Sequence, residues 1–143
     1  EWISKLVKQG YSDFIIEPKH DGLACKLLYK NGKFIQGSTR GNGYEGSDVT
    51  IVCKQIPDIP KQLDSTILND NFKKEIEVRG EIFLTKPGLD KINKYIIQYC
   101  PKETIKKNVR NTASGLLRDE NPNPNKSKYL TFLFCSGETK QAV

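Results

Sequence analysis

A polar dipeptide between two alternating apolar runs restricts how this chain can fold more than any other feature. Apolar residues occupy every second position of residues 23–29, Asn31-Gly32 follows, and residues 33–36 resume a strand-like pattern. Alternation with a period of two places the apolar side chains on one face of a strand. Asn and Gly tolerate the positive φ angles of a tight hairpin turn. The sequence therefore predicts an antiparallel hairpin with one buried face.

The remaining periodicity predicts a mixture of further strands and helices. Strands are expected at residues 14–17, 75–84 and 129–135, helices at 2–7 (followed by Gly10), 89–99 and 108–118, and loops at 40–48 and 121–125. Residues 63–72 fit either an insertion or a short helix. Leu89, Ile92, Ile96 and Tyr99 share one helix face, which is expected to pack in the core. Strands and helices do not alternate regularly, so we expect an α+β fold with antiparallel sheets flanked by helices.

The composition is that of one soluble globular domain or a piece of one. The chain has 143 residues, of which 36% are hydrophobic and 28% charged, and it contains neither a membrane-length apolar run nor a signal-peptide pattern. It begins at Glu1 and has no methionine, so we expect a fragment or a processed chain. The net charge of +6 favours a polyanionic partner.

The cysteines are too widely spaced to suggest a zinc site or a secreted disulfide framework. They stand at Cys25, Cys53, Cys100 and Cys135. Cys25 and Cys135 fall in strand-like apolar runs and are expected to be small buried residues. This usage favours a reducing intracellular, cytoplasmic location, and because no apolar run approaches the length of a membrane span, no membrane association is expected.

One lysine lies in a setting that suits a nucleophile. Residues 15–24 read Ile-Ile-Glu-Pro-Lys-His-Asp-Gly-Leu-Ala, so Lys19 has carboxylates on both sides, at Glu17 and Asp21, and a glycine at Gly22. A lysine that acts as a nucleophile must be held in place and must lose its proton, and burial or neighbouring groups can arrange both. The four residues 19–22 alone also fit a strand that ends in an Asp-Gly turn with an exposed lysine.

Three further segments follow this lysine in the chain. They are Ser-Thr-Arg-Gly-Asn-Gly at residues 38–43 leading to Gly-Ser-Asp-Val-Thr at 46–50, Glu-Val-Arg-Gly-Glu-Ile-Phe at 77–83, and Asn-Val-Arg-Asn-Thr-Ala-Ser-Gly-Leu-Leu-Arg at 108–118. Together with residues 17–24 they resemble, in order, the motifs of the adenylation domain of NAD-dependent DNA ligases. The resemblance implies a nucleotidyltransferase-type core of antiparallel sheets flanked by helices, with residues 1–143 as a partial adenylation domain.

The resemblance also implies a reaction. A lysine takes AMP from NAD+ and releases nicotinamide mononucleotide (NMN), the AMP passes to a DNA 5′-phosphate, and a 3′-hydroxyl displaces it to seal the nick, as DNA replication and repair require. The expected partners are therefore NAD+, Mg²⁺, nicked duplex DNA and the remaining domains of a parent ligase. Negative charge that spreads over the phosphoryl oxygens calls for cations around the site.

The same resemblance implies roles for individual residues in the lysine motif. Lys19 corresponds to the nucleophile, and Glu17 to the glutamate that contacts the adenine base. Asp21 corresponds to the aspartate that assists the later DNA steps, and Gly22 to the glycine that turns the chain beside the nucleotide. His20 fills the variable position of the motif and receives no catalytic role, because strand geometry would point it away from Lys19.

Four more residues take roles from the later motifs. Arg40 corresponds to an arginine near the ribose and the nick, and Glu81 to a glutamate at the ribose and near the metal. Arg110 and Arg118 correspond to arginines that contact phosphate and DNA. Taken singly, each of these charges also fits a solvated ion-pair partner. No protein ligand set for a metal is assigned.

The chain departs from the family pattern at several positions. Asn42 stands where Asp is common, Ser47 where an acidic residue is usual, and Val109 where proline is common, while Ser136 precedes Gly137 in place of an aromatic residue. No adenine-stacking aromatic is therefore assigned. The N-terminal NMN-binding subdomain and the two later lysine motifs are expected to lie outside these residues, so we expect the isolated chain to seal no nick.

Two other readings of the motifs remain open. Other lysine nucleotidyltransferases share the Lys-x-Asp-Gly motif, among them ATP-dependent DNA or RNA ligases and mRNA capping enzymes, although Glu-Pro before the lysine favours the NAD branch. A non-catalytic nucleic-acid-binding module that kept the fold is the second alternative. Binding phosphate alone would not require carboxylates at Glu17, Asp21 and Glu81.

Overall fold

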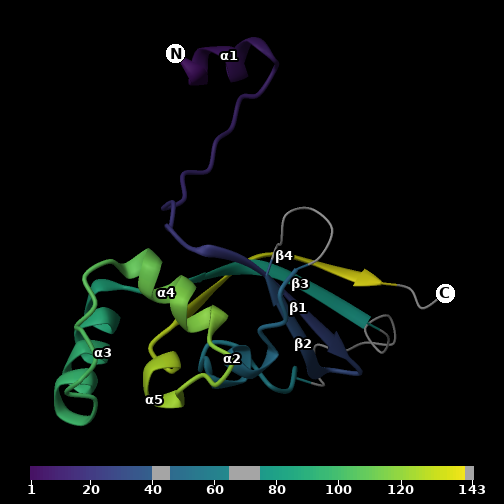
Figure 1. The fold of residues 1–143 in the computed structure, drawn as a ribbon. Coiled ribbons are helices and arrows are strands. Elements are labelled where there is room, and N and C mark those ends of the chain that lie inside the picture. Colours follow the sequence, from purple (N-terminus) through teal and green to yellow (C-terminus); the bar gives the residue numbers. More distant parts are fainter. Residues whose placement is uncertain (40–45, 65–74, 141–143) are drawn as a thin grey trace.

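A four-stranded antiparallel sheet organises the computed structural model, which describes residues 1–39, 46–64 and 75–140 (Figure 1). The strand order is β2-β1-β3-β4, so β1 and β3 are central. The strands are β1 (Leu23–Lys30), β2 (Lys33–Thr39), β3 (Glu75–Phe83) and β4 (Thr131–Lys140). The helices are α1 (Trp2–Lys8), α2 (Thr50–Gln55), α3 (Lys86–Tyr99), α4 (Val109–Arg118) and α5 (Pro124–Ser127). This arrangement confirms the expected α+β class.

The hairpin predicted from the alternating residues is present. β1 pairs with β2 in antiparallel register, and the turn residues Asn31 and Gly32 have φ angles of 51° and 78°. Positive φ is strained for most L-residues but accessible to Asn and Gly, which explains this pair at the turn. The predicted strand at residues 75–84 is also confirmed, since β3 pairs with β1 along its length.

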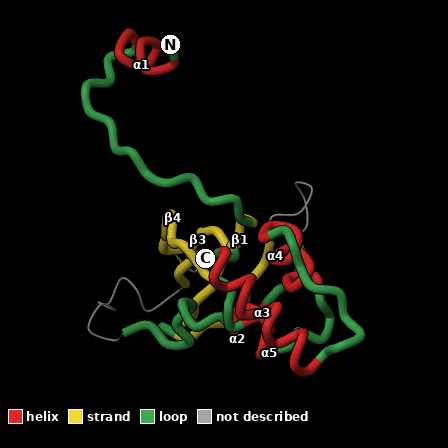
Figure 2. Tube along the Cα trace, turned by 90° about the vertical axis from the view of Figure 1, so that its left-hand side faces the viewer, coloured by secondary structure: helices red, strands yellow, loops and turns green. Residues whose placement is uncertain are grey.

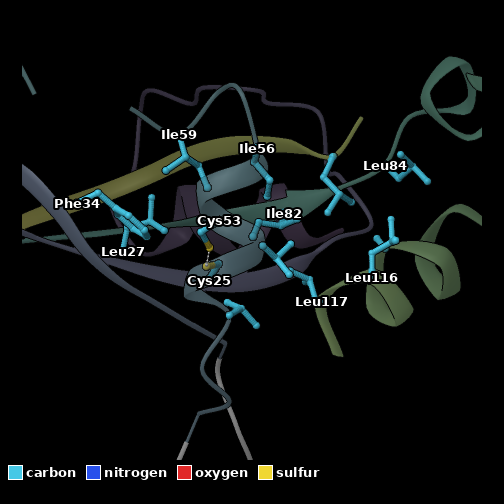
Figure 3. Packing of buried hydrophobic residues seen from close by; sticks show 14 of the residues in the cluster. Cys25, Leu27, Phe34, Cys53, Ile56, Ile59, Ile82, Leu84, Leu116 and Leu117 are labelled. Carbon is cyan, nitrogen blue, oxygen red and sulfur yellow. Dashed lines mark hydrogen bonds between the residues drawn. The ribbon is translucent and has the colours of Figure 1, made fainter. Parts of the chain in front are cut away.

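One face of the sheet carries the core (Figure 3). Cys25, Leu27 and Tyr29 of β1 are buried and pack in one cluster with Cys53 and Ile56. The thiols of Cys25 and Cys53 lie 3.9 Å apart, and this hydrogen-bonded contact, together with burial, raises the pKa of Cys53. The prediction that Cys25 is buried is therefore correct.

The same prediction for Cys135 is wrong, because this residue is exposed. The pairing of β3 with β4 shifts between Arg79 and Gly80, whose partners are Ser136 and Phe134. Cys135 is therefore the extra, unpaired residue of a bulge on an edge strand, where the regular alternation that buries every second side chain is interrupted.

Side-chain caps define where α3 and α4 begin. The Thr85 side chain accepts a hydrogen bond from Gly88 N at 3.1 Å, and the Asn108 side chain accepts one from Asn111 N at 2.8 Å. These bonds satisfy backbone N–H groups that have no partner in the first helical turn. The helix predicted at residues 108–118 is confirmed, with Asn108 as its cap.

The predicted apolar face of α3 is correct except at its end. Leu89, Ile92 and Ile96 are buried, but Tyr99 is 62% exposed. Tyr99 is the last residue of the helix, and its ring lies 5.0 Å from that of Tyr95 on the helix surface, so it does not pack into the core.

The loop predicted at residues 121–125 is wrong at its end, because the short helix α5 begins at Pro124.

The predicted N-terminal helix is present, and the strand predicted after it is not. α1 is followed by Gly10 at φ 94°, whereas residues 11–22 belong to no helix or strand and lead away from α1 to the sheet (Figure 2). Ile15 and Ile16 are 90% and 96% exposed. A strand requires hydrogen bonds to a neighbour, and no described strand pairs with residues 14–17, so local apolar character alone does not produce one.

Two predicted segments fall partly on residues that the structure does not describe. Residues 40–45 of the predicted 40–48 loop are among them, as are residues 65–72 of the 63–72 segment. On the described side, Gln62 forms an isolated bridge with Lys33, and Leu63 packs against the core cluster. No helix in the described parts of the chain is long and apolar enough to cross a membrane.

The buried phenol of Tyr29 makes stability depend on pH in the alkaline range. Tyr29 donates a hydrogen bond to the Pro60 carbonyl at 2.8 Å, and burial raises its pKa to about 12. A tyrosine in the unfolded chain titrates near pH 10, so between about pH 10 and 12 the unfolded state binds fewer protons than the folded state. The free energy of unfolding should therefore fall by on the order of 2 kcal/mol as the pH rises through this window.

Urea unfolding of the chain and of Tyr29→Phe from pH 7 to 11.5 tests this expectation. At pH 7 the variant should be less stable by about 1 kcal/mol, because the Pro60 carbonyl loses its donor. The difference should shrink above pH 10, since Phe does not ionise. Two stability curves that stay parallel up to pH 11.5 would contradict the assignment.

Candidate functional site

The lysine motif lies where the extended N-terminal segment joins β1. Glu17 and Lys19 are both exposed and, among the described residues, neither makes a hydrogen bond or an ion pair. Gly22 is buried against β3, and a Cβ added there would lie 2.6 Å from the Ile82 carbonyl oxygen. Glycine is therefore required for the chain to approach β3 this closely.

Asp21 is joined to a helix that lies far away in sequence. Its Oδ1 accepts a hydrogen bond from Nη1 of Arg110, in the first turn of α4, and the two groups form an ion pair. The side chains are 69% and 53% exposed, so the pair faces solvent. It brings together two of the residues to which the sequence assigned roles.

The ring of His20 stacks on that of Phe83, the last residue of β3. The ring centroids are 4.4 Å apart and the planes are inclined by 16°. His20 was expected to point away from Lys19 because of strand geometry, but this segment forms no strand. The stacking itself could not be read from the sequence, because it depends on how β1 and β3 are paired.

Glu81 lies on the outward face of the sheet, next to the lysine motif. Its strand partners are Ala24 and Leu133, and the alternation along β3 points its side chain away from the core residues Gly80 and Ile82. Glu81 is half-buried, and it makes no hydrogen bond or ion pair within the described part of the chain. Its carboxylate is therefore available to a ligand on this face.

The other residues with assigned roles are separated from this group or are not described. Arg118 ends α4, eight residues after Arg110 and hence about 12 Å further along the helix axis. It is exposed. Arg40 lies outside the described residues.

The outward face also carries a charged cluster that the sequence analysis did not single out. Glu77 of β3 is only 3% exposed, and its carboxylate lies 3.7 Å from Nζ of Lys26 and 3.0 Å from Nη2 of Arg79. The signal was the charge at alternate positions of β3 together with Lys26 on β1, but joining Lys26 to Glu77 requires the register of β1 against β3. Burial among two cations keeps this carboxylate paired.

The segment after residues 40–45 is fixed to β2 through Thr50. Its hydroxyl accepts a hydrogen bond from Gly37 N at 3.1 Å, and Val49 N donates to the Gly37 carbonyl at 2.9 Å. Asp48 accepts a hydrogen bond from Thr50 N at 2.8 Å, and hydrogen bonds from Thr50 hold its pKa below the usual value. The Asp-Val-Thr run therefore has a structural function, since it anchors the start of α2.

Because the Asp21–Arg110 pair is exposed, we expect it to contribute little to stability. A double-mutant cycle with Asp21→Asn and Arg110→Gln should give a coupling free energy of at most about 1 kcal/mol, decreasing with salt. Urea unfolding of the four proteins at low and high ionic strength measures this coupling. A value above about 2 kcal/mol that resists salt would mean that the pair is shielded from water.

A four-stranded antiparallel sheet with flanking helices, and an exposed lysine in a Lys-x-Asp-Gly segment just before β1, agree with the nucleotidyltransferase class that the sequence motifs imply. A comparison with known protein families identifies the particular family. Residues 1–142 match the model of the NAD-dependent DNA ligase adenylation domain. The chain belongs to this family.

Similar proteins named DNA ligase occur in several bacteria. The chain is 40% identical over 120 residues to one from Campylobacter jejuni subsp. doylei, and 43% identical to those from Mycoplasmopsis agalactiae over 121 residues and Malacoplasma penetrans over 128. These matches cover 84%, 85% and 87% of this chain but only 17%, 16% and 16% of the relatives. The chain therefore spans about one sixth of the length of these curated relatives.

Proposed function

We propose that this chain is the catalytic core of the adenylation step of an NAD-dependent DNA ligase, and that Lys19 is the residue that receives AMP. The observation that carries the proposal is the family match over residues 1–142, which includes all four sequence motifs. The exposure of Lys19 and its lack of a partner among the described residues support the role, because a nucleophile must reach a ligand.

The proposed step forms one bond and breaks one. Nζ of Lys19, after losing a proton to solvent, attacks the α-phosphorus of the AMP half of NAD+. A P–N bond forms, the bond from that phosphorus to the bridging oxygen breaks, and NMN leaves with the electron pair. The lysine–AMP phosphoramidate stores the activation for the later transfer to DNA.

The flanking residues have proposed roles in holding the nucleotide. Glu17 would contact the adenine, Gly22 would let the backbone approach the nucleotide, and Glu81 would bind the ribose. Asp21 would assist the later DNA steps, with Arg110 holding its carboxylate in one orientation. Arg40 is proposed to act near the ribose and the nick, from outside the described residues.

The residues present also fit a magnesium ion that shares its ligands with the substrate. No group of three or more His, Cys, Asp or Glu residues in the described ranges could hold a metal by itself. Mg²⁺ at phosphoryl-transfer sites is usually held by one or two carboxylates together with substrate phosphates and water. The free carboxylate of Glu81 would hold it, and the ion would neutralise charge on the phosphate oxygens.

The proposed partners of the whole enzyme are nicked duplex DNA and further domains of the same ligase. Arg110 and Arg118 lie at opposite ends of α4 and, with the net charge of +6, suit contacts to DNA phosphates. The short share of the relatives that this chain covers supports a longer parent protein. The free thiols fit the proposed reducing, cytoplasmic location.

Intact-protein mass spectrometry of the full-length protein tests the proposal. The protein, freed of prebound AMP, is incubated with Mg²⁺ and either NAD+ or ATP. An AMP-sized mass gain with NAD+ alone is expected. A gain with ATP alone would move the protein to the ATP-dependent ligases or capping enzymes. No gain with either donor would favour a non-catalytic nucleic-acid-binding module.

A further inference from the structure

Three consecutive residues of the lysine motif each contact the rest of the fold, two of them at the end of β3 and one at α4. His20 stacks on Phe83, Asp21 pairs with Arg110, and Gly22 packs against the backbone of Ile82. The residues before them behave differently: Glu17, Pro18 and Lys19 are exposed and belong to no helix or strand. The fastening therefore begins at the residue directly after Lys19.

The stacking of His20 is the contact nearest to Lys19 along the chain. Its centroid distance of 4.4 Å and inclination of 16° are those of packed, nearly parallel rings. Both rings are half-buried, whereas the Asp21–Arg110 pair that follows is more than half exposed. An exposed ion pair restrains a chain weakly because water competes for both charges. The ring contact is consequently the firmer of these two restraints.

The position of this restraint matters because a lysine side chain has four rotatable bonds. Phosphoryl transfer needs the attacking atom roughly in line with the leaving oxygen, and small displacements of a reacting group are costly in rate. Since the segment on the N-terminal side of Lys19 has no packing contact through Ile15 and Ile16, which are almost fully exposed, the direction of the lysine depends on its C-terminal side.

We propose that His20 is a positioning residue for Lys19, and that it acts through the stacking of its ring on Phe83 and not through its titratable nitrogens. This inference rests on the proposed function, in which Lys19 is the nucleophile. It assigns a purpose to the variable position of the Lys-x-Asp-Gly motif in this chain: an aromatic ring there anchors the nucleophile to the end of β3.

The proposal is tested by single-turnover self-adenylylation of the full-length enzyme over a range of NAD+ concentrations. His20→Ala should lower the maximal rate about tenfold, as expected for a misdirected nucleophile, with the NAD+ concentration at half-maximal rate changed less than twofold. His20→Phe keeps a ring that can stack and should restore the rate to within about threefold of wild type. Phe83→Leu should lower the maximal rate about as much as His20→Ala does. The variant that carries both substitutions should be little slower than either single variant, because both remove the same contact.

Several outcomes would overturn the proposal. If His20→Phe is as slow as His20→Ala, the imidazole nitrogens and not the stacking are important. If His20→Ala reacts at the wild-type rate, or changes only the NAD+ dependence, His20 does not position Lys19. Thermal melting of each variant separates a loss of rate from a loss of fold, and His20→Phe provides the folded comparison if the alanine variant is unstable.

The same experiment separates failure of this inference from failure of the proposed function. Wild-type protein must gain AMP on a peptide that contains Lys19, and Lys19→Ala must not. If the wild type gains AMP at another residue, or gains none, the proposed function is wrong and the inference is overturned with it. If the wild type behaves as proposed and only the His20 variants differ from expectation, the inference alone is wrong.

Discussion

Lys19→Ala in the full-length protein should abolish self-adenylylation with NAD+, lowering the rate by at least about a thousandfold. Alanine has no group that can form the P–N bond, so no weaker version of the same step remains. Lys19→Arg should be equally inactive, because the guanidinium keeps the positive charge but is not deprotonated in proteins. The rate is measured by intact mass or by transfer of labelled AMP from NAD+.

A second exposed lysine, on β1, provides the matched control for this prediction. Lys30, at the end of β1, is also exposed, and Lys30→Ala should react at the wild-type rate. Peptide mapping of the wild-type adduct should place AMP on the peptide containing Lys19. Adduct formation that persists in Lys19→Ala would show that another residue is the nucleophile.

Gly80→Ala should destabilise the chain by about 3 kcal/mol or more, as measured by urea unfolding. Gly80 is central in β3, and a Cβ there would overlap the Leu133 carbonyl oxygen and the ring of Phe132, with Cε2 of that ring at 2.6 Å. The carbonyl belongs to the backbone of the paired strand, so it cannot move aside as the end of a side chain can. The overlap can be relieved only if β3 and β4 separate or change their register.

Gly115→Ala is the control with the same change and the opposite expected sign. A Cβ at Gly115, within α4, would have no atom within 4 Å. Alanine favours helix over glycine, so this variant should be more stable by about 0.5–1 kcal/mol. A stability of Gly80→Ala within about 0.5 kcal/mol of wild type would mean that the two strands do not approach this closely.

Local patterns predicted those elements whose causes are local. The hairpin follows from alternation and two residues that accept positive φ, and the helix predicted at residues 108–118 is confirmed as α4. The wrong predictions concern residues whose structure depends on pairing with another strand. Residues 14–17 have strand-like side chains but no paired neighbour, and Cys135 has the right alternation but sits in a bulge. Neither absence of pairing nor a bulge is encoded in the residue itself.

In the candidate site, too, the residues themselves could be predicted from the sequence, but their long-range contacts could not. The motif residues were identified from their order in the chain, and the register of β1 against β3 then explains why Gly22 contacts Ile82 while Glu81 pairs with Ala24. The pairing of Asp21 with Arg110 and the stacking of His20 on Phe83 join residues far apart in sequence. Such contacts depend on how α4 and β3 are placed in the fold, which one sequence does not reveal.

The strand order also bears on when the site can form during folding. β1 meets β2 through a two-residue turn, so the hairpin can close early and at small entropic cost. The ends of β1 and β3 that hold the lysine motif, at Leu23 and Ile82, are about sixty residues apart along the chain, and such distant pairings are the slow part of folding. During synthesis on the ribosome, the hairpin can therefore exist well before the lysine motif packs against β3, so a nascent chain has this part of the sheet before it has the candidate site.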